Sequence, residues 1–209
     1  MDIKTDHGKK RIFIVGMPRS GSTLLETILS LNPEIKDLGE SRSLEKSILK
    51  FQQKSGNDFD QQNLDDLYSQ LEPISDLHLQ YTVDKQLYNF IFVDTVATYM
   101  PSAKIIHCRR NPMDNILSMY RSNLQTGNNF TSNLSDAAKV LVAHEQAMQV
   151  HKERYPEKIF AFDYDEFVNE PETNLSTILE WLELEWEQRY LQPETNKRTI
   201  NTASVIQAR

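Results

Sequence analysis

Apolar residues gather in three short runs that predict buried strands. The runs cover residues 11–15, 104–108 and 158–162, and Ile, Val, Phe, Ala and Cys make up most of each one. Nearly continuous apolar runs of this length are typical of parallel strands that are covered on both faces. A fourth and shorter strand is expected at residues 81–84. The chain therefore contains at least four segments suited to one buried sheet.

Segments with helical spacing of apolar residues lie between these strands. Asn32-Pro33 marks the end of the first helix, and Pro112 suits the first turn of a later one. Asp136 and Glu172 lie where a first helical turn favours negative charge. The expected helices are residues 23–31, 43–54, 64–71, 87–99, a helix from about residue 112, 135–154 and 171–184.

The alternation of strands and helices predicts an α/β fold. Strands joined through helices pair in parallel, so we expect a three-layer sandwich with a central parallel sheet. Such sheets bind their ligands beyond the carboxyl ends of the strands. With 209 residues the chain suits one domain, and we expect a single domain over residues 1–209.

The balance of charge limits the classes of partner. A formal net charge of −7 argues against non-specific binding of nucleic acid or of an anionic membrane. This charge is unevenly distributed, because residues 157–194 contain eleven acidic and two basic residues. The rest of the chain therefore carries a small positive charge and can hold a local anion site.

Cysteine usage and hydropathy indicate the compartment. Cys108 is the single cysteine, which excludes an internal disulfide and a cysteine-based zinc site. No stretch approaches the ~18 apolar residues of a membrane span, and residues 1–11 are polar and unlike a signal peptide. These features favour the reducing cytoplasm, without a membrane anchor.

Candidate chemistry begins with residues 16–23, G-M-P-R-S-G-S-T, between a predicted strand and a predicted helix. In this context backbone N–H groups converge on one point at which the helix dipole favours an anion. Gly16 and Gly21 permit the tight path of the chain. The hydroxyl donors of the segment are Ser20, Ser22 and Thr23.

This segment is a P-loop variant, which makes the fold similar to that of P-loop nucleotide kinases. Ser22 occupies the position of the lysine that contacts the β- and γ-phosphates in nucleoside triphosphatases. Arg19 offers a planar cation instead, so the loop suits a 5′ group with less charge than a triphosphate. The alternative is a Gly/Ser turn that binds no ligand.

A second candidate anion site follows the strand at residues 104–108. Arg110 lies just after this strand, and Ser118 lies eight residues further on. If Pro112 starts a helix, both side chains can reach one phosphate. Taken alone, the segment is better explained by a surface arginine pair capped by Asp114. The phosphate interpretation gains weight from the neighbouring loop.

Together these stretches resemble the sulfotransferases that use 3′-phosphoadenosine 5′-phosphosulfate (PAPS). The resemblance covers nearly all of residues 11–209. It is closest to the branch of tyrosylprotein sulfotransferases and of bacterial sulfotransferase domains often fused to tetratricopeptide repeats. The shared stretches are I-V-G-M-P-R-S-G-S-T-L-L-E at 14–26, N-P-E-I at 32–35, G-E-S-R at 39–42, D-K at 84–85, A-K-I-I-H-C-R-R-N-P-M-D at 103–114 and N-T-A-S-V at 201–205.

The resemblance implies a role for each candidate residue in binding PAPS. Arg110 with Ser118 would hold the 3′-phosphate, with Arg121 as a further candidate for a phosphate contact. Tyr164 matches a tyrosine near the nucleotide, and Ser204 matches a serine of a C-terminal nucleotide loop. The residues implied to cradle the 5′-phosphosulfate are Arg19, Ser20, Gly21, Ser22 and Thr23.

For catalysis, the resemblance implies that Glu40 is the general base and that Lys85 lies near the transferred group, together with Arg19. No metal is expected, because arginine and lysine neutralise the charge of the moving group. The acceptor would be a hydroxyl of a protein tyrosine, a sugar or a small molecule, and the product is adenosine 3′,5′-bisphosphate (PAP).

Two departures from the family keep alternatives open. The sequence stops at Arg209, where the family continues with a segment that closes over the nucleotide, so we expect the domain to lack its C-terminal end. Tetratricopeptide repeats are also absent. The alternatives are an inactive PAP- or PAPS-binding domain and a P-loop kinase of a small molecule. A hydrolase built on His107 and His144 is set aside, because His107 lies inside an apolar strand and is expected in the core.

Overall fold

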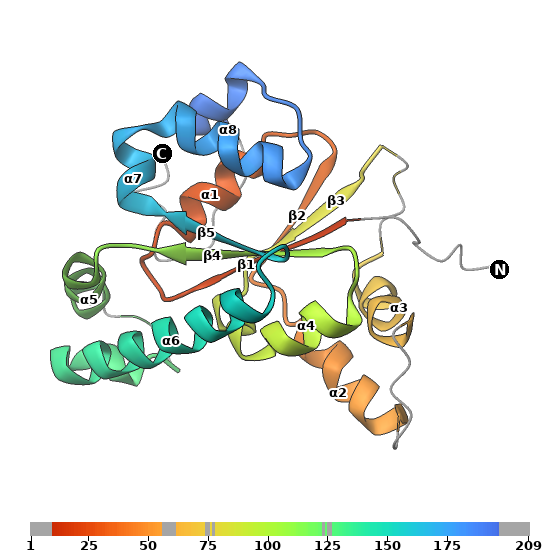
Figure 1. The fold of residues 1–209 in the computed structure, drawn as a ribbon, viewed down its shortest axis with the longest axis horizontal. Coiled ribbons are helices and arrows are strands. Elements are labelled where there is room, and N and C mark those ends of the chain that lie inside the picture. The colour runs from red at the N-terminus through yellow and green to blue at the C-terminus, as the bar shows by residue number, and fades with distance from the viewer. Residues whose placement is uncertain are drawn as a thin grey trace.

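A computed structural model describes residues 10–55, 62–73, 76, 78–122, 124 and 127–196, and these form one central sheet covered by helices on both faces (Figure 1). The sheet has five parallel strands in the order β2-β3-β1-β4-β5. This confirms the expected α/β sandwich. The strands are β1 (Lys10–Gly16), β2 (Ile35–Gly39), β3 (Tyr81–Asp84), β4 (Ala103–Arg109) and β5 (Ile159–Asp163).

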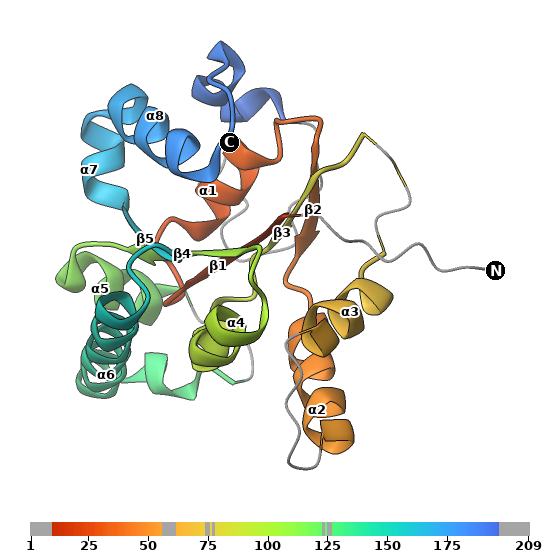
Figure 2. The ribbon, with the colours of Figure 1, turned by 45° about the vertical axis from the view of Figure 1, so that its right-hand side comes forward.

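The helices form the two outer layers of the sandwich. α1, α7 and α8 cover one face, α2, α3, α4 and α6 cover the other, and α5 lies beyond the carboxyl end of β4 (Figures 1 and 2). The helices are α1 (Ser22–Leu29), α2 (Ser43–Ser55), α3 (Gln62–Leu71), α4 (Val93–Tyr99), α5 (Pro112–Arg121), α6 (Leu134–Arg154), α7 (Tyr164–Asn169) and α8 (Pro171–Leu182), with short 3₁₀ turns at Leu87–Phe92, Asn129–Ser132, Gln188–Leu191 and Pro193–Thr195.

The central strand β1 has an apolar side chain on both faces. Ile12 and Ile14 belong to the core beneath α1 and α8, whereas Phe13 and Val15 belong to the core beneath α2, α3 and α4. Each of these four residues is at most 1% exposed. A strand with both faces covered does not alternate apolar with polar residues, which explains the continuous apolar run of residues 12–15.

A third, smaller core holds the loop after β1 against the helices at the edge of the sheet. Met17 is buried with Met119 of α5 and with Ala137 and Leu141 of α6. Because Met17 is the first residue after β1, this packing fixes the direction in which the loop leaves the strand. The backbone of the anion-binding segment is thus positioned by apolar contacts outside it.

Two elements were not predicted. The edge strand β2 has polar residues at Lys36 and Asp37, so it lacks the apolar run that marks the other strands. α7 begins directly after β5, where the Asp163 side chain accepts hydrogen bonds from the N–H groups of Asp165 and Glu166. The expected single helix at residues 87–99 is instead a 3₁₀ turn followed by α4.

Hydropathy of the helices bears on the membrane expectation. Within the part of the chain that the structure describes, every helix is too short or too polar to cross a lipid bilayer.

Candidate functional site

The loop between β1 and α1 adopts a backbone path that requires glycine at one position. Gly21 precedes α1 with φ at 92°, in the left-handed region. A Cβ atom there would lie 2.4 Å from Cδ2 of Tyr164, which is too close for any side chain. Arg19 also has a positive φ of 70°, an uncommon conformation for an arginine. The loop is therefore bent at two places, and its glycine contacts the tyrosine that was expected near the nucleotide.

Neighbouring elements hold this loop in place and leave one of its hydroxyls unpaired. The Nδ2 of Asn115 in α5 donates a hydrogen bond of 2.8 Å to the carbonyl of Pro18. The hydroxyl of Ser20 is buried and has no hydrogen-bond partner among the described residues. A buried hydroxyl without a partner at the start of a helix points to a ligand that would accept from it.

Two arginines meet beside the loop. The Nε of Arg19 donates to the hydroxyl of Ser118 at 3.1 Å, and the Nη1 of Arg110 donates to the Arg19 carbonyl at 3.5 Å. The guanidinium of Arg110 also lies 4.8 Å from the ring centre of Tyr164. The structure thus brings Arg19, expected at the 5′-phosphosulfate, together with Arg110 and Ser118, expected at the 3′-phosphate. Tyr164, expected near the nucleotide, lies beside them.

Like charges are concentrated here. Partial burial, and then the positive charge of Arg110, lower the pKa of Arg19 from its ordinary value. The Nε of Arg110 is buried and, among the described residues, has no hydrogen-bond partner. Two adjacent guanidinium groups repel each other unless an anion lies near both. The arrangement suits a bound phosphate or sulfate.

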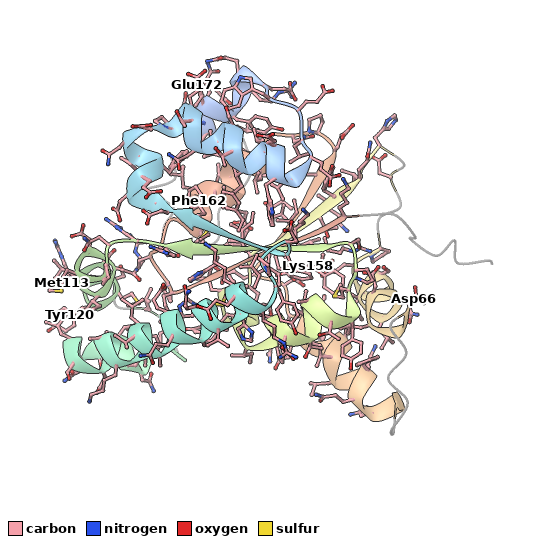
Figure 3. The ribbon with its side chains drawn as sticks, viewed as in Figure 1. Asp66, Met113, Tyr120, Lys158, Phe162 and Glu172 are labelled. Atoms are coloured by element: carbon pink, nitrogen blue, oxygen red, sulfur yellow. The ribbon has the colours of Figure 1, made fainter. Side chains whose placement is uncertain are left out.

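These side chains surround a cavity of about 460 Å³ at the carboxyl edge of the sheet. Met113 and Tyr120 lie on the outer side of α5 in Figure 3, and both are exposed. Ser22 and Thr23 are buried in the first turn of α1 and do not line this cavity. The lining residues are Arg19, Arg110, Asp114, Leu117, Ser118, Arg121 and Ser122.

A second cluster lies at the ends of β2 and β3. The Lys85 ammonium group lies 2.6 Å from Oε1 of Glu40 and 3.8 Å from Oε2 of Glu26. Lys85 is 1% exposed, whereas half of the Glu40 side chain is exposed. The Lys85 backbone N–H donates to the carbonyl of Gly39 at 2.8 Å, which aligns the two strand ends. The candidate base and the candidate lysine are therefore in direct contact.

Asp84 supplies a further carboxyl group beside this cluster. Burial raises the pKa of Asp84 to about 7, although its carboxylate accepts hydrogen bonds from the Gln86 N–H and the Tyr68 hydroxyl. A fraction of Asp84 is consequently uncharged at neutral pH. The charge of Lys85 is then balanced mainly by its two glutamates.

Glu26 is a member of this cluster that the sequence did not reveal. It lies on α1 among buried residues and is itself 1% exposed. The sequence did offer one signal, a glutamate on the apolar face of the predicted helix. A buried carboxylate is rare unless it has a charged partner. Of the expected site residues, Ser204 lies outside the described part of the chain.

With this geometry in view, comparison with known proteins identifies the family. A sequence model described as "Sulfotransferase family" matches residues 11–188. The chain belongs to the sulfotransferase family.

Two curated relatives extend the comparison. An "Uncharacterized protein" of Aquifex aeolicus (strain VF5) is 31% identical over 220 residues, which is 96% of this chain and 29% of that protein. A "Putative protein-tyrosine sulfotransferase" of Caenorhabditis briggsae is 26% identical over 193 residues, covering 86% of this chain and 68% of the relative. The chain thus spans less than a third of the first relative and about two thirds of the second.

A solved structure supports the fold. The mouse sulfotransferase SULT7A1, whose structure is described as complexed with PAP, superposes with a TM-score of 0.54. The sequences are 15% identical, and the match covers 88% of this chain and 62% of the mouse chain. At this level of identity the likeness concerns the fold.

Proposed function

We propose that this sulfotransferase-family protein transfers a sulfuryl group from PAPS to a hydroxyl acceptor and releases PAP. The observation that carries this proposal is the convergence of Arg19, Arg110 and Ser118 on one cavity beside the loop before α1. Two arginines that line one cavity favour the binding of an anion there. PAPS supplies one at each end of its nucleoside.

The residues present fit a nucleotide with two anionic ends. The unpaired Ser20 hydroxyl and the N–H groups at the start of α1 suit the 5′-phosphosulfate, together with Gly21, Ser22 and Thr23. Arg110 and Ser118 suit the 3′-phosphate, with Arg121 on the same cavity. Because Arg19 bonds Ser118 from within the loop, we infer that it lies between the two anionic groups.

Glu40 is proposed as the general base. The ammonium of Lys85, at 2.6 Å, holds the Glu40 carboxylate in place, and this carboxylate accepts the proton of the acceptor hydroxyl. The bound donor supplies the sulfuryl group, whose bond to the 5′-phosphate oxygen breaks as the bond from sulfur to the acceptor oxygen forms. Arg19 and the loop N–H groups stabilise the negative charge left on the phosphate. In this proposal the transfer step uses no metal, since arginine and lysine neutralise that charge.

The acceptor is proposed only as a class, a hydroxyl of a protein tyrosine, a sugar or a small molecule. One half-exposed carboxylate beside an open edge of the sheet suits all three. A cytoplasmic location is proposed from the single cysteine, Cys108, which is buried.

Calorimetric titration with PAP, beside ATP with magnesium, tests the proposal. We expect PAP to bind more tightly than ATP, and Arg110→Ala to weaken PAP about 10- to 100-fold, as loss of a charged hydrogen bond does. Arg109→Ala is the matched control, because this neighbouring arginine pairs with Asp163 and does not line the cavity. Preference for ATP with magnesium would favour a kinase. PAP binding without turnover of PAPS on any hydroxyl acceptor would favour an inactive binding domain.

A further inference from the structure

A group of metal-ligating side chains lies on the opposite face of β4 from the main core. His107 lies between Ile106 and Cys108, which both face α1 and α8, so its imidazole faces α6. There it meets His144 and Glu145. The two imidazole ring centres are 5.0 Å apart, and the ligand atoms of all three residues lie within 4.8 Å of one another.

The separations of these atoms match those around a small tetrahedral ion. The Nε2 of His107 lies 3.3 Å from Oε1 of Glu145, and the Nδ1 of His144 lies 3.4 Å from the same oxygen. Zinc bonds of about 2.0–2.1 Å place neighbouring ligands of a tetrahedron about 3.3–3.4 Å apart. Two of the three separations between ligand atoms therefore match a tetrahedral site, and the third is no more than 4.8 Å.

The imidazole nitrogens lack other partners. Within the described residues, Nε2 of His107 and both ring nitrogens of His144 are buried without a hydrogen bond of acceptable geometry. His107 is 4% exposed and His144 is 2% exposed. The ring of Phe90 packs edge-on against His144 at 4.6 Å and offers no acceptor. Buried polar atoms are nearly always satisfied by protein, water or an ion. Here one oxygen of Glu145 faces two imidazoles at 3.3 and 3.4 Å, and an ion held by all three residues would satisfy them together.

We propose that His107, His144 and Glu145 bind a zinc-like divalent ion. Two imidazoles and a carboxylate are a common three-residue ligand set for Zn²⁺, whereas Mg²⁺ and Ca²⁺ prefer oxygen ligands alone. Glu145 is 36% exposed and lines a second cavity, of about 490 Å³, which gives the ion a path from solvent. Two arginines, Arg109 and Arg110, line this cavity too, but its carboxylates outnumber them, namely Asp114, Glu145, Asp163, Asp165 and Glu166. The site is independent of the proposed sulfuryl transfer.

Zinc binding to untagged protein, freed of metal by dialysis against a chelator, tests this site. Competition with a chromogenic zinc indicator should reveal one tight site per chain. Glu145→Gln and His144→Gln should each weaken it by at least ~100-fold, more than the ~10- to 100-fold typical of changes outside the ligand set. His151→Gln is the matched control, because His151 lies on the same helix, outside the cluster.

A second measurement keeps the test independent of folding. Co²⁺ should give the visible absorption of a tetrahedral site in the wild type and in His151→Gln, and should lose it in Glu145→Gln. Glu145 is partly exposed, so this variant should retain the circular dichroism spectrum of the wild type. The absence of a tight site in the wild type, or equal zinc affinity in folded Glu145→Gln, would overturn the proposal.

Discussion

At the carboxyl edge of the sheet, the arginines beside β1 and β4 face each other, whereas the lysine after β3 faces two glutamates. In the first group partial burial, and then the positive charge of Arg110, lower the pKa of Arg19. In the second group Lys85 is nearly fully buried and is compensated from within the protein by Glu40 and Glu26. The difference is that Lys85 already has its opposite charges within the protein, whereas the arginine region is the one in which the proposed function puts an anion.

The largest effect is expected from removing the carboxylate of Glu40, the exposed partner of Lys85. Glu40→Gln should lower kcat about 10²–10⁴-fold, because the acceptor hydroxyl loses its proton acceptor. PAP affinity should stay within about threefold of the wild type, since Glu40 is outside the arginine cavity. Turnover and calorimetry measure the two quantities. Glu45→Gln, a surface glutamate of α2, is the control, and unchanged kcat in Glu40→Gln would refute the assignment.

Removing the lysine should destabilise the protein. In Lys85→Met the buried carboxylate of Glu26 loses the ammonium group at 3.8 Å, and removing one partner of a buried ion pair costs about 3–5 kcal/mol of unfolding free energy. Urea denaturation measures the loss. Adding Glu26→Gln should restore part of it, and the exposed Lys46→Met should have little effect. If Lys85→Met unfolds at the same urea concentration as the wild type, the region is not held together by this charge.

Removing Arg19 from the arginine region should weaken PAP binding strongly and change the stability of the protein little. Arg19→Gln should weaken PAP binding about 10- to 100-fold, because a charged contact to the anion is lost. The unfolding free energy of the ligand-free protein should change by only about 0.5 kcal/mol, since a repulsion is removed with the hydrogen bond to Ser118. Arg42→Gln is the control. Arg42 is exposed and pairs with Glu45, so this change should leave PAP affinity and unfolding free energy unchanged. A large loss of stability in Arg19→Gln would show that Arg19 stabilises the ligand-free protein, as Lys85 does.

Two glycines sharpen the comparison with the smallest expected effects. Gly39, which precedes Glu40, has a φ of 62° and open space around it. Gly39→Ala should therefore lower the unfolding free energy by about 1–2 kcal/mol, the cost of the left-handed backbone alone. Gly21→Ala should cost more, because its Cβ would collide with Tyr164. It should also weaken PAP, whereas Gly39→Ala should not. Equal losses of stability would argue against the close contact of Gly21 with Tyr164.

The sheet was largely predictable because its inner strands are covered on both faces. The apolar runs of the inner strands β1 and β4 follow directly from that burial, and the edge strand β5 has a similar run at residues 159–162. The opposite edge strand, β2, contains the polar residues Lys36 and Asp37 and carries no such signal. The parallel sheet and the helices between strands could therefore be predicted, while strand β2 and the short helix α7 could not.

The candidate site was predictable in its motifs and less so in its contacts. The Gly- and Ser-rich loop and the Arg110–Ser118 spacing are local features of the sequence. The bond from Arg19 to Ser118 joins residues 99 positions apart, and depends on how α5 packs. The burial of Glu26 and the meeting of His107 with His144 likewise depend on tertiary packing. No spacing rule along the chain contains that information.

The central position of β1 has a consequence for how the chain folds during synthesis. β1 emerges first, yet its partners β3 and β4 lie far along the sequence, with Gly16 paired to Cys108. At typical translation rates of about 5–20 residues per second, the first strand waits roughly 5–20 s for its second neighbour. During that interval an apolar segment has no sheet to join. The nascent chain is then most exposed to aggregation, and the loop after β1 can form last although it is made first.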